Sequence, residues 1–73
     1  MAQMIPSEHR REFIEGPLEE AAIEANNDVS FLDYFDKNGE AVIIVFDDDS
    51  KKVVDIKGKS LDEVTAEIMK AIS

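Results

Sequence analysis

Apolar residues recur every three or four positions near the start of the chain, which predicts an amphipathic helix over residues 7–26. The residues that would share its buried face are Ile14, Leu18, Ala21 and Ala25. Gly16 and Pro17 interrupt this pattern, because proline has no amide hydrogen and clashes with the preceding turn. We therefore expect either a sharp kink or two short helices that meet at Gly16.

A second helical pattern occupies the end of the chain. Ser60 and Glu63 have the Ser-x-x-Glu spacing of a capping box, in which each side chain binds the other residue's backbone amide. The apolar residues that follow at helical spacing are Leu61, Val64, Ile68 and Ile72. This segment is the best-specified helix of the sequence.

The middle of the chain reads as three strands over residues 30–35, 40–47 and 51–57. The pair Asn38–Gly39 predicts a hairpin between the first two strands, because both residue types tolerate a positive φ. Residues 48–50 form a second turn, and Gly58 ends the third strand. The sequence therefore predicts one α+β domain over residues 1–73. Its three-stranded antiparallel meander is flanked by a kinked or split N-terminal helix and a C-terminal helix, in the order α-β-β-β-α.

The central strand is apolar on both of its faces. Ala41, Ile43 and Val45 point one way, whereas Val42, Ile44 and Phe46 point the other way. If both helices cover one face of the sheet, which is the simplest packing, the other face stays apolar and uncovered. Such a patch is typical of an interface, and a homodimer is its commonest form. The alternatives are that the two parts of the first helix cover different faces, or that long charged side chains shield the patch.

Composition excludes several classes of protein. The chain has 73 residues, of which 44% are hydrophobic, so it can form one small core and is not a disordered acidic tail. It has no cysteine, which excludes disulfides, a thiolate nucleophile and cysteine-ligated metals. No apolar run approaches the length of a membrane span, and residues 1–6 do not resemble a signal peptide. We expect a cytoplasmic protein of a cell or of a virus-infected host.

Acidic residues are concentrated in one part of the sequence. The net charge is −9, and residues 12–49 alone contain twelve acids and one lysine. The candidate partner-binding carboxylates are those on one predicted helix face and in the second turn: Glu8, Glu12, Glu15, Glu19, Asp47, Asp48 and Asp49. Such a surface attracts basic proteins, and rows of carboxylates resemble nucleic-acid phosphates. The favoured hypothesis is a small acidic protein-binding module, an inhibitor or nucleic-acid mimic that binds a basic protein surface. The alternatives are a merely solubilising surface and a self-associating assembly protein.

No pattern predicts an enzyme, a cofactor or a metal site. Asp36, Asn38 and Glu40 resemble the opening of an EF-hand calcium loop, but Ala41 stands where that loop requires glycine. Three consecutive aspartates at a strand end cannot all converge on one ion. His9 is interpreted as a solvated helix residue, because no nucleophile or orienting partner accompanies it.

Four lysines precede the last helix, at positions 51, 52, 57 and 59. The α-β-β-β-α order resembles that of double-stranded RNA-binding domains, which carry basic residues in this region. In this chain Asp62 and Glu63 stand where further basic residues would be needed. With an overall charge of −9, direct nucleic-acid binding is the least favoured alternative.

Overall fold

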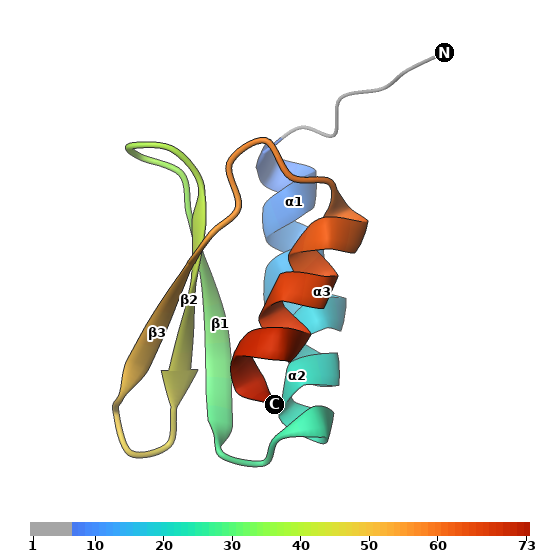
Figure 1. Ribbon diagram of the computed structural model, residues 1–73. Coiled ribbons are helices and arrows are strands. Elements are labelled where there is room, and N and C mark those ends of the chain that lie inside the picture. The colour runs from blue at the N-terminus through green and yellow to red at the C-terminus, as the bar shows by residue number, and fades with distance from the viewer. Residues whose placement is uncertain (1–6) are drawn as a thin grey trace.

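A computed structural model describes residues 7–73 and the side chains of residues 10–73. Its elements follow the predicted order (Figure 1). They are α1 (Ser7–Phe13), the π-helical turn η1 (Ile14–Leu18), α2 (Glu19–Ala25), β1 (Val29–Phe35), β2 (Ala41–Phe46), β3 (Lys51–Asp55) and α3 (Leu61–Ile72). The predicted α+β architecture is confirmed.

The sheet is an antiparallel meander with β2 in the centre. Both predicted turns form hairpins. In the first, only Gly39 has a positive φ, of 107°, and five residues separate the paired Phe35 and Ala41. In the second, Asp49 takes the left-handed conformation at φ 70°. Short polar side chains such as aspartate tolerate this region better than most.

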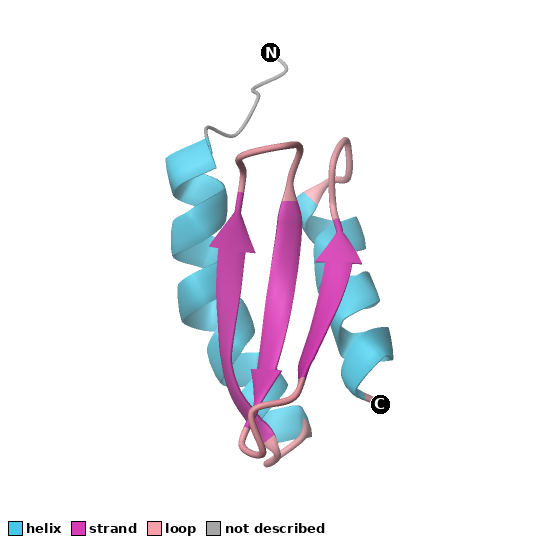
Figure 2. Ribbon diagram, turned by 90° about the vertical axis from the view of Figure 1, so that its left-hand side faces the viewer, coloured by secondary structure: helices cyan, strands magenta, loops and turns pink. Residues whose placement is uncertain are grey.

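All the helical segments lie on one side of the sheet. In Figure 1 the strands stand to the left of every helix, and in Figure 2 the sheet is in front of them. The alternative in which α1 and α2 cover opposite faces is therefore wrong. The core lies between the layers, where Leu32, Val42 and Ile44 of the sheet are buried against Ile14 and Ile68 of the helices.

The predicted interruption at Gly16 and Pro17 takes the form of a π-helical turn, η1, which joins the two short helices α1 and α2. This wider turn contains one residue more than an α-helical turn, so every later residue of the helix is shifted by one position around the helix axis. The prediction that Ala21 and Ala25 share the buried face is consequently wrong. Ala22 is completely buried beside Ile14 and Leu18, whereas Ala21 and Ala25 are exposed.

Polar contacts hold the helices in place. The predicted capping box of α3 is confirmed, with Ser60 and Glu63 bonded reciprocally. The Asn26 side-chain amide donates to the carbonyl of Ile72 at 2.9 Å, which joins the ends of α2 and α3. Arg10 donates to the carbonyl of Lys59 at 3.0 Å, and its Nε lies 3.0 Å from the Glu40 carboxylate. Within residues 7–73, no helix has the length and apolar character needed to cross a bilayer.

Candidate functional site

The side of the sheet that faces away from the helices, called here the outer face, carries all three of the large apolar side chains that are exposed among the described residues. The strand register places its nine residues in three rows across β1, β2 and β3 (Figure 2). The rows are Phe31–Val45–Lys51, Asp33–Ile43–Val53 and Phe35–Ala41–Asp55. Successive side chains of a strand alternate between faces, so these nine share one side.

Three large apolar side chains on the outer face are in contact with solvent. Phe31 and Phe35 are each 44% exposed, and Val53 is 69% exposed. They surround the half-buried Ile43 in the middle of the face. On a half-solvated antiparallel sheet, polar residues normally occupy such positions. The sequence prediction of an uncovered apolar face is therefore confirmed in its geometry.

Charged residues lie only at the margins of this face. Lys51 and Asp55 occupy the two ends of β3, and Asp33 lies on the edge strand β1. All three side chains are exposed. The Asp55 carboxylate also accepts a hydrogen bond from the amide of Lys57 at 3.1 Å, which fixes its position at the end of the strand. The arrangement is an apolar centre with a polar rim, as in protein–protein interfaces.

The sequence pattern did not mark Val53 or Asp55 as site residues, and it grouped Lys51 only with the other lysines before the last helix. One signal for Val53 was present, since Val53 and Val54 are consecutive in a strand and must point to opposite faces. Val54 packs against the core, which leaves Val53 outside. The pairing of these residues with β1 and β2 depends on register, which the sequence pattern did not specify.

Two of the predicted partner-binding carboxylates are engaged within the molecule. Glu15 accepts a hydrogen bond from the backbone amide of Tyr34 at 2.8 Å, and Glu19 accepts one from the amide of Leu32 at 2.9 Å. Both amides point away from β2, along the open edge of β1. These glutamates therefore satisfy an edge strand that would otherwise offer unpaired donors to another chain.

The rest of the predicted helix face is divided. Glu12 is exposed on α1, and the side chain of Glu8 lies outside the described residues, as do those of Ser7 and His9. The four glutamates thus do not form one free row of carboxylates. Whether any of them contacts a partner stays a prediction.

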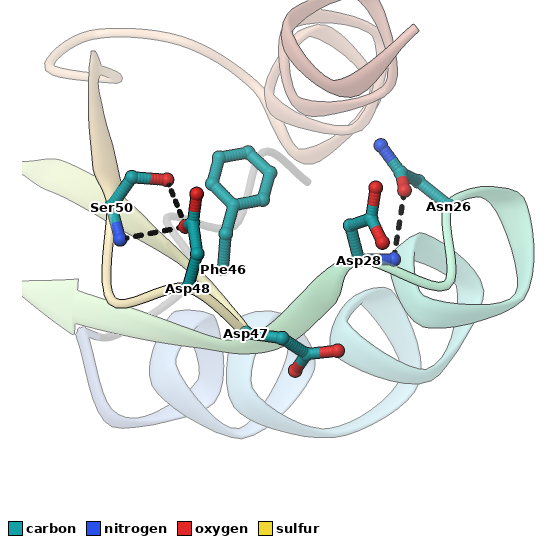
Figure 3. A pocket seen from close by; sticks show the side chains of 6 residues that line it. All are labelled: Asn26, Asp28, Phe46, Asp47, Asp48 and Ser50. Carbon is teal, nitrogen blue, oxygen red and sulfur yellow. Dashed lines mark hydrogen bonds between the residues drawn. The ribbon is translucent and has the colours of Figure 1, made fainter.

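The Asp47–Asp49 turn lies at the opposite end of β2 from Glu40, next to the start of β1. All three aspartates are exposed. Asp47 and Asp48 line a shallow hollow of about 400 Å³, together with Asn26, Asp28, Phe46 and Ser50 (Figure 3). The half-buried ring of Phe46 stands between the carboxylates of Asp48 and Asp28 in this view. No lysine or arginine is among these six residues, so the lining of the hollow itself is negative and includes an aromatic side chain.

Asp48 differs from the other acids of the hollow. The Ser50 hydroxyl donates to its carboxylate at 2.6 Å and the Ser50 amide at 2.9 Å. These two hydrogen bonds lower the pKa of Asp48 below its ordinary value, because they stabilise the charged form. The carboxylate thus stays ionised to a lower pH and also shapes the turn. In Figure 3 the Asp47 side chain points away from Asp48. Among the described residues, no group of three or more acidic or histidine side chains is arranged to hold a metal ion.

The four lysines near the last helix do not gather into one basic surface. Lys51 belongs to the outer face, whereas Lys52 donates to the carbonyl of Ala71 at 2.7 Å. Lys59 lies 3.9 Å from the Glu67 carboxylate. The first turn of α3 is acidic, with Asp62 and Glu63, so it is not arranged to attract phosphate.

The chain matches no protein-family model, no curated protein and no solved structure in the three comparisons made. The surfaces described above are therefore the basis on which a function can be proposed.

Proposed function

We propose that this chain is a protein-binding module whose docking surface is the outer face of its sheet. The observation that supports this proposal is the exposure of Phe31, Phe35 and Val53 around Ile43, on the face that no described helix covers. Burial of these side chains against another protein would remove apolar surface from water, which is the main driving force of association. The charged side chains at the rim, Lys51, Asp33 and Asp55, would then determine the orientation of the bound partner.

A photo-crosslinking residue at position 53 tests this function in the cells that normally make the protein. We expect it to capture one defined protein, and a crosslinking residue at position 25 on α2 serves as the matched control. Ala25 is also exposed but lies on the helical side of the molecule. Capture from position 53 should be lost when Ile43 is replaced by glutamate. Equal capture from both positions, or none from position 53, would contradict the proposal.

A second candidate function is electrostatic binding of a basic protein, as an inhibitor or nucleic-acid mimic. The hollow with Asp28 and Asp48 on either side of Phe46 favours it, because a lysine or arginine side chain would meet these two carboxylates and an aromatic ring there. The binding site of this candidate is the hollow together with the Asp47–Asp49 turn.

Nuclear magnetic resonance titration with an arginine-rich peptide distinguishes this second function. We expect the largest shifts at Asp28 and at residues 46–50, and we expect them to disappear in high salt. The variant D28N/D47N/D48N should lose the shifts. The matched control E12Q/E20Q/E24Q removes the same charge from exposed helix positions and should keep most of them. Shifts spread evenly over all acidic residues would indicate nonspecific attraction only.

A further inference from the structure

This inference rests on the proposed function and names the occupant of the outer face. We propose that the partner is a second copy of this chain, packed sheet against sheet. The two-fold axis of this dimer crosses the strands along the row Asp33–Ile43–Val53. The layers would then follow the order helices, sheet, sheet, helices.

The basis is a symmetry in the rows of the outer face. A two-fold axis along the middle row exchanges the outer rows, so each strand lies over the same strand of the partner, running in the opposite direction. Phe31 then meets the partner's Phe35, and Phe35 meets the partner's Phe31. Ile43 and Val53 each meet their own copies. All exposed aromatic rings of the face are therefore paired with rings, which is a favourable contact in stacked or edge-on geometry.

The charges of β3 fit the same axis. Lys51 and Asp55 lie in the two outer rows of this strand, so each Lys51 meets the partner's Asp55. The dimer thus contains two symmetry-related ion pairs at its rim. Asp33 lies in the middle row at the edge strand, so the two Asp33 carboxylates face each other. This single repulsive contact sits on an exposed edge, where solvent screens it.

The other symmetric arrangement has its axis parallel to the strands and is less favourable. It would lay β1 over the partner's β3, within the same row. Asp55 would then face the ring of the partner's Phe35, and Asp33 would face the partner's Val53. A carboxylate is repelled by the negative face of an aromatic ring and loses hydration against valine. This arrangement would also place Lys51 on the ring of the partner's Phe31, a favourable contact for a cation. The axis across the strands avoids both unfavourable contacts and gives Lys51 a carboxylate partner instead.

The size of the face determines the strength of the dimer. Three strands about 4.8 Å apart and rows about 6.6 Å apart bury only a few hundred Å² per protomer. Stable complexes bury roughly 800 Å² per partner. We therefore expect a dissociation constant in the micromolar range. Each protomer carries a charge of −9, so repulsion between the two copies opposes association. Added salt should strengthen the dimer, because it screens that repulsion between whole protomers more than it weakens the two ion pairs at the rim.

Analytical ultracentrifugation of the full chain, from about 10 μM to 1 mM, tests the dimer directly. We expect a monomer–dimer equilibrium that shifts toward the dimer as salt is raised. Val53→Glu should weaken association at least about tenfold, because it places two carboxylates against each other. Ala25→Glu adds the same charge on α2 and should leave the constant nearly unchanged. Circular dichroism confirms that both variants fold. A monomer over the whole concentration range would overturn the inference.

Two charge reversals test the orientation of the axis. Lys51→Asp and Asp55→Lys each place like charges at both rim contacts, so each variant alone should dimerise several-fold more weakly. In an equimolar mixture, the heterodimer regains opposite charges at both contacts and should form in preference to either homodimer. Asp33→Asn removes the one repulsive contact and should tighten the wild-type dimer. If the mixture shows no heterodimer preference, the axis does not cross the strands and the proposed pairing is wrong.

The experiments distinguish failure of the dimer proposal from failure of the proposed docking function. Crosslinking from position 53 to another copy of the chain supports both proposals. Capture of a different protein, with a monomer in the centrifuge, overturns the dimer and leaves the docking function standing. No capture and no dimer would overturn both.

Discussion

The carboxylate of Glu15 accepts a hydrogen bond from the backbone amide of Tyr34, 19 residues later in the chain, at 2.8 Å. One helical turn further on, Glu19 binds the amide of Leu32 in the same way at 2.9 Å. The first helix therefore covers the free edge of β1 with acceptors as well as covering the core with Ile14 and Leu18. Two of the four glutamates that the sequence suggested for a partner therefore bind the edge of the sheet.

Replacing Glu15 or Glu19 by alanine should destabilise the fold by about 1–2 kcal/mol each, because a half-buried backbone amide loses its acceptor. The change is measured by urea unfolding. Hydrogen exchange should separate the two sites, since Glu15→Ala exposes the Tyr34 amide and Glu19→Ala exposes the Leu32 amide. Glu12→Ala is the matched control on the same helix and should cost less than about 0.5 kcal/mol. Exchange that rises equally at both amides in both variants would contradict the pairing.

The freed edge should also be more prone to association. An uncapped β1 presents unpaired donors to other strands, which is a common route to aggregation. We expect Glu15→Ala/Glu19→Ala to scatter more light than wild type on incubation at the same concentration. Equal scattering by the two proteins would indicate that the edge is protected by other means.

Ala22→Gln should be far more damaging than Ala21→Gln. Both changes introduce the same helix-forming residue, but Ala22 is completely buried and Ala21 is exposed. We expect a loss of roughly 3 kcal/mol for Ala22→Gln, from overpacking and the burial of an amide, and less than about 0.5 kcal/mol for Ala21→Gln. Thermal or urea unfolding measures both. The reverse ranking would mean that the π-helical turn does not set the phase of α2.

The side chain of Arg10 should contribute substantially to the free energy of unfolding. Its guanidinium donates to the carbonyl of Lys59 and lies beside the Glu40 carboxylate, with only 12% of the side chain exposed. Arg10→Ala should lower the free energy of unfolding by about 2 kcal/mol, because the Lys59 carbonyl and the Glu40 carboxylate lose their partner in a partly buried site. Arg11→Ala, which removes a cation placed 5.5 Å from the ring centre of Tyr34, should cost under about 1 kcal/mol. Similar losses in urea unfolding would show that Arg10 acts only as a surface charge.

Glu63 of the capping box should make the free energy of unfolding depend on pH in the acidic range. Hydrogen bonds from the backbone and side chain of Ser60 lower the pKa of Glu63 below its ordinary value. A group whose pKa is lower in the folded state stabilises the fold fully above its unfolded pKa, near 4.5. That stability is lost as the pH falls through the lowered folded value. Glu63→Gln should therefore show a shallower loss of stability below about pH 4.5 than wild type, in urea unfolding at several pH values. Parallel curves for the two proteins would contradict this.

Local patterns predicted the elements that local physics controls. The capping box at Ser60 and Glu63 lies within one helical turn, and the alternation of β2 needs only the period of a strand. Both were found where the sequence placed them. The π-helical turn was not foreseen, because Gly16 and Pro17 signal an interruption without specifying how the chain passes it. The wrong assignment of Ala21 and Ala25 follows from that one extra residue.

The candidate site divides in the same way. The apolar excess of β2 predicted an uncovered face, and the structure has one. The role of Glu15 and Glu19 was not predictable, because nothing near them in the sequence distinguishes a carboxylate that binds a strand edge from one that faces solvent. The cross-strand neighbours of Val53 could not be predicted from the sequence either. The row Asp33–Ile43–Val53 depends on the register of the three strands.

The sequence alone determined the order of helices and strands, the excess of negative charge and the presence of more apolar residues than one sheet face can bury. These follow from spacing and composition, which act over a few neighbouring residues. The tertiary structure decided which face of the sheet stays uncovered, which glutamates are engaged at the edge of β1, and that Lys51 and Asp55 lie at opposite ends of one apolar surface. These depend on the docking of segments distant in the chain, where packing and register select among arrangements that are locally equivalent.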